Sequence, residues 1–147
     1  MSSLGQPRAV VYCYPLTGAP GKGLPENWDL IPGARGCTPQ ACGFRDHHLE
    51  LAELGAAVYA VSTQPTDYQR EMADRLHLPF AVLSDAKLRF SRSLRLPVFE
   101  AGGHTLIKRL TLVVRTGAIE HVFYPVFPPN AAAAVVLSWL RAHPLSS

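Results

Sequence analysis

The sequence has few cysteines and no segment long enough to cross a membrane. Its 147 residues include only three cysteines, an odd number that does not fit a disulfide-bonded secreted framework. No apolar run reaches the roughly 20 residues of a membrane-spanning helix. The opening residues, Met-Ser-Ser-Leu-Gly-Gln-Pro, lack the charged and apolar parts of a signal peptide. We therefore expect a cytoplasmic protein of bacterial type with no membrane partner.

Neither sign of charge is in large excess. Lys and Arg number 14 against 11 Asp and Glu, which gives a formal net charge of +3 without any basic block. Nothing in this pattern favours nucleic acid as a partner. Apolar residues make up 48% of the chain and charged residues 17%, as in ordinary compact soluble proteins. We expect one domain, residues 1–147, that is large enough to bury a core.

The residues that could carry chemistry gather in the stretch GCTPQACGFRD, residues 36–46, which holds two of the three cysteines. Cys37 is predicted where a loop enters a helix, with Thr38 able to accept an N-cap hydrogen bond and Pro39 suited to the first turn. The positive end of a helix dipole and its free N–H groups stabilise a thiolate, the nucleophilic form of cysteine. Zinc is a weaker interpretation of this stretch, because no second cysteine pair follows.

The spacing of Cys37 and Cys42 has consequences of its own. In an intact helix, residues five apart lie roughly 8–9 Å apart at Cα, whereas a disulfide needs Cα atoms within about 7 Å. A bond between these two cysteines would therefore require the first helical turn to unwind. Spacing alone leaves two interpretations open: redox chemistry, or two unrelated cysteines at a loop edge and inside a helix. The third cysteine, Cys13, falls in an apolar strand and is expected to be buried and inert.

The order of the predicted elements indicates an α/β fold. Strands are expected at residues 8–14, 56–61 and 80–83, and helices at 44–54, from 66 or 67 to about 76, and from 84 or 85 to about 94. This alternation implies right-handed crossovers and a mostly parallel sheet. Two further strands, 105–115 and 118–124, are joined across Thr116-Gly117 as an antiparallel hairpin, and residues 131–141 form a closing helix. The fold class predicted is a central mixed sheet flanked by helices.

The stretch around the cysteines, Gly-Cys-Thr-Pro-Gln-Ala-Cys-Gly-Phe-Arg-Asp, resembles the active-site segment of peroxiredoxins. The likeness is closest to the Q-type, or bacterioferritin comigratory protein, group and extends from Val10 to about Trp139. It implies a thioredoxin-like fold, which the predicted order of elements also fits. It further implies that Cys37 is the peroxidatic cysteine and Cys42 the resolving one.

Two more residues take roles from this resemblance. Arg109, in the run Lys-Arg-Leu-Thr-Leu-Val-Val, looks like the arginine of the family's Arg-x-Thr-x-hydrophobic strand, which reaches the peroxidatic sulfur. A permanent cation there stabilises a thiolate and polarises the peroxide O–O bond. The alternative is a surface charge flanking a strand. Gln40 fills a position that is often polar in the family, and would either order Arg109 or cap the helix.

The chain departs from the family pattern in three places. Peroxiredoxins carry Pro-x-x-x-Thr-x-x-Cys, but here a loop insertion, residues 16–33, separates Pro15 from Cys37, and Ala34 stands where the threonine is expected. Thr17 could supply the missing hydroxyl if the insertion loops out; otherwise it is a simple loop residue. The N-terminus is also short, because the first core strand is reached by residue 9 and the usual N-terminal hairpin is missing. Either the hairpin is dispensable or a partner chain covers the exposed edge.

The resemblance implies a two-cysteine thiol peroxidase for hydrogen peroxide and organic hydroperoxides. The thiolate of Cys37 becomes a sulfenic acid, Cys42 condenses with it, and thioredoxin or a similar dithiol reduces the disulfide. No metal, haem or flavin is required, and we expect a monomer or a homodimer. One alternative is a thioredoxin-like disulfide oxidoreductase, which the C-x4-C spacing disfavours. Another is a redox-sensing or binding module without turnover, which would explain Ala34 and the missing hairpin.

Overall fold

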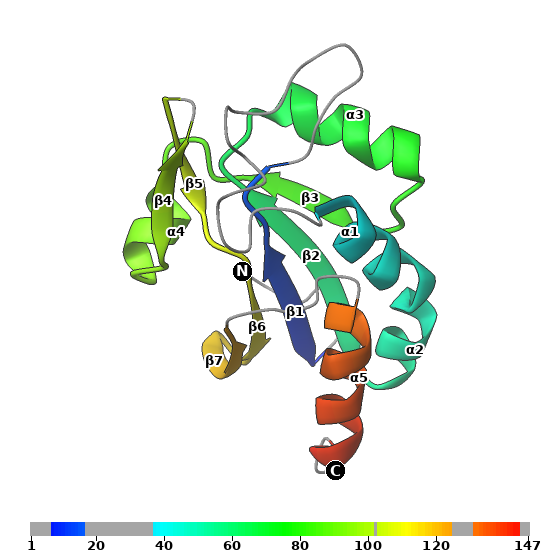
Figure 1. Cartoon of the computed structure of the whole chain (residues 1–147). Helices are drawn as coiled ribbons and strands as arrows, with labels where there is room; N and C mark the ends of the chain where they lie inside the picture. The colour runs from blue at the N-terminus through cyan, green and yellow to red at the C-terminus, as the bar shows by residue number, and fades with distance from the viewer. Residues whose placement is uncertain (1–6, 17–36, 102, 125–130, 145–147) are drawn as a thin grey trace.

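A five-stranded mixed sheet forms the centre of the computed structural model, which describes residues 7–16, 37–101, 103–124 and 131–144. The strands lie in the order β3-β2-β1-β6-β7 (Figure 1). Their bounds are Arg8–Cys13 for β1, Ala56–Ser62 for β2, Ala81–Ser84 for β3, Leu110–Arg115 for β6 and Ala118–Phe123 for β7. Pairing is parallel from β1 to β2 and from β2 to β3, and antiparallel from β1 to β6 and from β6 to β7.

The middle strand, β1, is buried along its whole length and carries core residues on both faces. Val10 and Tyr12 belong to one apolar cluster, and Val11 and Cys13 to another. Successive side chains of a strand point to opposite faces, so the sheet is covered on both sides, as the nearly all-apolar run predicts.

Helices cover the two faces unequally. Buried residues of four helices join the cluster of Val10 and Tyr12: α1 (Cys37–Asp46), α2 (His48–Glu53), α3 (Thr66–Leu76) and α5 (Ala132–Ala142). The opposite face packs against Phe90 of α4 (Arg89–Ser93) and against Leu96. Figure 1 shows α1, α2 and α5 together on one side of the sheet and α4 on the other. The predicted fold class, a central mixed sheet flanked by helices, is confirmed.

The helix predicted at residues 44–54 is wrong in its bounds. The structure has two helices there, α1 beginning at Cys37 and α2 ending at Glu53, separated by a turn at His47. Thr38 therefore lies inside the first turn of α1 rather than at its N-cap. The break also changes which side chains face the core, and Leu49, predicted on the apolar stripe, is 68% exposed. Gly55 ends the segment at φ 80°, a conformation that suits glycine.

The strand predicted at residues 105–115 is two strands in two sheets. Its first part belongs to β5 (His104–Ile107), which pairs with β4 (Val98–Ala101) in a small antiparallel sheet that the sequence did not reveal. Lys108 and Arg109 form the bend that leads into β6. At that bend the Lys108 N–H donates to the carbonyl of Pro97. The hairpin turn at Thr116-Gly117 is as predicted, with both residues at positive φ.

The N-terminal ends of α3 and α4 differ from the predicted helix caps. Thr66 is the first residue of α3, and Pro65 precedes it in extended conformation, with no side-chain cap. The helix α4 is shorter than predicted and begins at Arg89. Asp85 still serves it, since its carboxylate accepts hydrogen bonds of 2.9 Å from the N–H groups of both Phe90 and Ser91.

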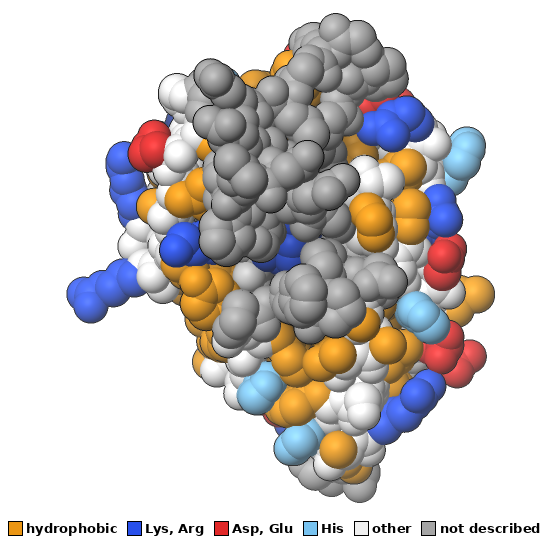
Figure 2. Space-filling model, in the orientation of Figure 1, with side chains coloured by type: hydrophobic (Ala, Val, Ile, Leu, Met, Phe, Trp, Pro, Cys, Tyr) orange, Lys and Arg blue, Asp and Glu red, His pale blue; other side chains and the backbone are white. Residues whose placement is uncertain are grey.

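The lower half of the face in Figure 2 is rich in exposed apolar side chains, over β7 and α5. Exposed large apolar residues of these two elements include Ile119 and Val122 of β7 and Val135 of α5, and Tyr124 follows the strand. No helix among the described residues is both long and apolar enough to cross a membrane.

Candidate active site

Cys37 begins α1 in the part of the chain that the structure describes, and its side chain points into the core. Only 5% of the residue is exposed, and it belongs to the apolar cluster that contains Tyr12 and Phe44. The sequence reaches this arrangement because α1 packs its buried residues against β1, which brings the helix start over the sheet. The N-terminal end of a helix favours negative charge.

The guanidinium of Arg109 reaches the sulfur from the other side of the site. Its Nη2 donates a hydrogen bond to Cys37 Sγ at 3.1 Å, and its Nη1 donates to Gln40 Oε1. Arg109 is 3% exposed and Gln40 is fully buried. The rigid fork of a guanidinium can hold two acceptors at once, so Gln40 orients the group that contacts the sulfur. A buried cation at this distance stabilises a thiolate more strongly than it would in water.

The structure thus brings together three of the residues singled out from the sequence: Cys37, Gln40 and Arg109. Burial does not fit Arg109 as a surface charge, and the side-chain oxygen of Gln40 accepts from Arg109. Cys42 lies on the same helix, half-buried, five residues after Cys37. All three cysteines are free thiols, and α1 is continuous from Cys37 to Asp46.

Comparison with known proteins identifies the family. The Redoxin family model matches residues 4–137. Peroxiredoxin Bcp of Escherichia coli K12 is 31% identical over 140 residues, which cover 92% of this chain and 80% of that protein. The chain is a member of the peroxiredoxin family. Chloroplastic peroxiredoxin Q of Oryza sativa subsp. japonica is 29% identical over 139 residues, 94% of this chain and 56% of the relative.

Solved structures agree with this peroxiredoxin assignment. Peroxidoxin BcpB from Mycobacterium tuberculosis superposes with a TM-score of 0.74 at 28% identity, covering 98% of this chain and 83% of that one. The bacterioferritin comigratory protein of Xanthomonas campestris gives 0.70 at 21% identity over 95% and 80% of the two chains, a likeness that concerns the fold. The family is that of thiol-dependent peroxidases, which act on hydroperoxides with thioredoxin-like reductants, and this chain is one of them.

Two positions of interest in this peroxiredoxin fall outside the described residues. They are Thr17, the candidate replacement hydroxyl, and Ala34, at the position where the family pattern has threonine. The same holds for the insertion, residues 16–33, apart from Leu16.

Cys13 is buried on the sheet face opposite the site. It packs with Val11 and Val61, and its exposure is 0%. Burial, with a smaller effect from Asp85, raises the pKa of its thiol to about 12. At neutral pH this thiol stays protonated, as expected for an inert core cysteine.

Two residues near Cys37 were not predicted from the sequence to belong to the site. Tyr12 and Tyr14 are buried in the same cluster as Cys37. Burial, helped by the negative charge that Cys37 would carry, raises the pKa of both hydroxyls. The available signal was their alternation in the strand with Val10, which places all three on one face.

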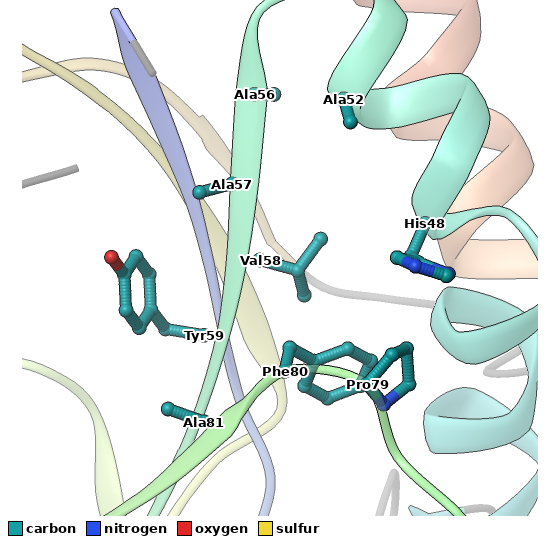
Figure 3. Close-up of a pocket in the computed structure, with 9 residues that line it drawn as sticks. All are labelled: His48, Ala52, Ala56, Ala57, Val58, Tyr59, Pro79, Phe80 and Ala81. Carbon is teal, nitrogen blue, oxygen red and sulfur yellow. The ribbon is translucent and has the colours of Figure 1, made fainter. Parts of the chain in front are cut away.

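A separate hollow of about 290 Å³ lies between β2, the start of β3 and α2. Figure 3 shows Val58, Phe80, Pro79 and His48 turned toward one another around it, with Tyr59 pointing away. None of Cys37, Gln40 and Arg109 lines it. The described residues contain no cluster of three or more His, Cys, Asp or Glu that could hold a metal ion.

Proposed function

We propose that Cys37 is the peroxidatic cysteine and Cys42 the resolving cysteine of this peroxidase, acting on hydrogen peroxide and organic hydroperoxides. The observation that supports this most is the hydrogen bond from buried Arg109 to Cys37 Sγ at 3.1 Å. Gln40 holds the other arm of the guanidinium. A cation so fixed stabilises the thiolate before attack and the negative charge that develops on the peroxide oxygens during it.

The proposed chemistry has two stages. The Cys37 thiolate attacks the terminal peroxide oxygen, an S–O bond forms, the O–O bond breaks, and an alkoxide or hydroxide leaves and takes up a proton. The sulfenic acid then condenses with the thiol of Cys42, releasing water and forming a disulfide. A dithiol of the thioredoxin type reduces that disulfide by exchange.

Resolution requires α1 to open. Cys37 and Cys42 lie on one continuous helix, where residues five apart are roughly 8–9 Å apart at Cα, beyond the reach of a disulfide. We therefore propose that the first turns of α1 unwind after oxidation. Gly43, directly after Cys42, lowers the helical propensity there.

The rest of the proposal concerns organisation. A single thioredoxin-like domain of residues 1–147 in the cytoplasm, with no nucleic acid or membrane partner and no metal or organic cofactor, is sufficient for this chemistry. Cys37, Gln40 and Arg109 all come from one chain. Either a monomer or a homodimer can therefore contain a complete site.

Turnover with a thioredoxin system tests this function. The chain, thioredoxin, thioredoxin reductase and NADPH are mixed with hydrogen peroxide or cumene hydroperoxide, and both NADPH and peroxide are followed. We expect sustained consumption of the two in equal amounts. Consumption of NADPH with a disulfide substrate but not with peroxide would indicate a disulfide oxidoreductase. Loss of one equivalent of peroxide followed by a stop would indicate a sensor. Either result would contradict the proposed cycle.

A further inference from the structure

Within the described part of the chain, several buried polar atoms without hydrogen-bond partners belong to residues that pack or pair with those of the Cys37 site. The hydroxyls of Tyr12, Tyr14 and Thr111 and the Nε2 of Gln40 are among the atoms in this condition. None of the four residues is more than 1% exposed. Most buried polar groups in proteins are paired, and an unpaired one costs stability. Several at one place indicate where the polar atoms of a ligand belong.

Strand register places these groups around the reactive sulfur. Tyr12 is opposite Thr111 in the pairing of β1 with β6, and Cys13 is opposite Leu110. The register ends at this pair, which Tyr14 directly follows on one strand and Arg109, whose guanidinium contacts Cys37 Sγ, directly precedes on the other. Tyr14 thus leaves the sheet at the same end as the residue that contacts the sulfur, and it packs in the same cluster as Cys37.

Tyr12 and Tyr14 differ in their ring contacts and in their place along the strand. Tyr12 stacks on Phe44 with ring centroids 4.5 Å apart and planes 2° apart, and it meets Phe80 edge-on at 5.8 Å. Its position is fixed by core packing. Tyr14 follows the last residue of β1, at the end of the strand nearest Arg109. The Ser62 hydroxyl lies near enough to lower the Tyr14 pKa, an effect smaller than that of burial, but no hydrogen bond of ordinary geometry joins the two.

We propose that the Tyr14 hydroxyl is a catalytic group that donates a hydrogen bond to the hydroperoxide bound at Cys37. This inference rests on the proposed function of Cys37. Ala34 offers no hydroxyl at the position where the family pattern has threonine, and Tyr14 supplies one from the strand instead. The hydrogen bond goes to the oxygen that leaves, and it strengthens as that oxygen gains negative charge.

The step balances without any further reactant. The Cys37 thiolate bonds to the terminal oxygen of the peroxide and keeps it, with its hydrogen, as a sulfenic acid. The other oxygen departs with the O–O electron pair and takes up the proton released when the thiol ionised, through water. Tyr14 donates a hydrogen bond throughout and is not consumed. Burial raises the Tyr14 pKa above its ordinary range, so the hydroxyl keeps its proton at neutral pH.

The test compares Tyr14→Phe with the wild-type chain. The substitution removes the hydroxyl and keeps the ring, so the core stays filled. Single-turnover oxidation by hydrogen peroxide is followed by stopped flow, and the Cys37 thiolate is titrated separately by alkylation against pH. We expect the second-order rate constant to fall about 10- to 100-fold, as for the loss of a donor to a developing oxyanion, while the titration curve stays in place. Thermal melting verifies that the variant folds.

Tyr59→Phe is the matched control, because it also removes a tyrosine hydroxyl, from a residue that packs on the opposite face of the sheet. Its rate is expected to equal that of the wild type. A Tyr14→Phe rate equal to wild type, or a fall fully explained by a loss of thiolate, would overturn this inference alone. A wild-type chain whose Cys37 does not react with peroxide would overturn the proposed function and this inference with it.

Discussion

Cys37→Ser is expected to reduce peroxide no faster than the uncatalysed reaction. The serine hydroxyl supplies almost no anion at neutral pH, so Arg109 and the helix start have no nucleophile to stabilise. The variant should retain its fold, because serine is close in size to cysteine and the site is already polar on one side, where Arg109 and Gln40 meet. Peroxide loss and thermal melting measure the two expectations.

Cys13→Ser is the matched control for this variant. It makes the same substitution in a cysteine that lies on the other face of the sheet, packed with Val11 and Val61. We expect wild-type peroxidase activity from the folded variant, with a lower melting temperature because a hydroxyl enters an apolar cluster. Activity that survives Cys37→Ser and disappears in Cys13→Ser would show that the nucleophile is Cys13 and not Cys37.

Arg109→Ala is expected to slow the attack on peroxide about 100- to 1,000-fold, the range seen when a preorganised donor to a developing oxyanion is removed. The fraction of Cys37 present as thiolate, measured by alkylation against pH, should fall as well, since the nearest cation is lost. A surface charge, the alternative that the sequence left open for Arg109, could be removed with the fold intact, but Arg109 is 3% exposed. Removing it leaves Gln40 Oε1 without its donor, at a cost of about 1–3 kcal/mol.

Two further variants separate chemistry from stability. Arg109→Lys keeps the charge but not the planar fork, so it should restore the thiolate fraction more than the rate. Arg115→Ala removes a half-buried arginine at the far end of β6, the strand that follows Arg109, and its rate should match the wild type. An unchanged attack rate in Arg109→Ala would show that the contact with Cys37 has no role in the reaction.

The fold was predictable from the sequence where burial leaves a strong pattern. The nearly all-apolar run predicted β1 within a residue, and the turn at Thr116-Gly117 predicted where β6 ends and β7 begins. The break between α1 and α2 was not predictable from the sequence, since Leu49 fits an apolar helical stripe although it is 68% exposed. The small sheet of β4 and β5 was missed because a bend at Lys108 and Arg109 leaves no mark in a run that is β-rich throughout.

The site required more than local pattern. Arg109 contacts residues 69 and 72 positions away, and no periodicity in the sequence indicates a contact of that range. Only the resemblance of its surroundings to a family strand placed it near Cys37. Tyr14 was overlooked for a different reason. An aromatic residue in an apolar strand is typically core, and its missing hydrogen-bond partner becomes evident only when the neighbours are known.

The most direct test of the central claim, that Cys37 reacts and Cys42 resolves, is peptide mapping by mass spectrometry after one equivalent of hydrogen peroxide. Cys42→Ser serves as the control, since it should stop at a Cys37 sulfenic acid and pass to the sulfinic acid with excess peroxide. In the wild type we predict a Cys37–Cys42 disulfide within one chain, with Cys13 still available to alkylation after denaturation. A Cys37–Cys13 bond, or a bond between two chains, as the main product would contradict the account.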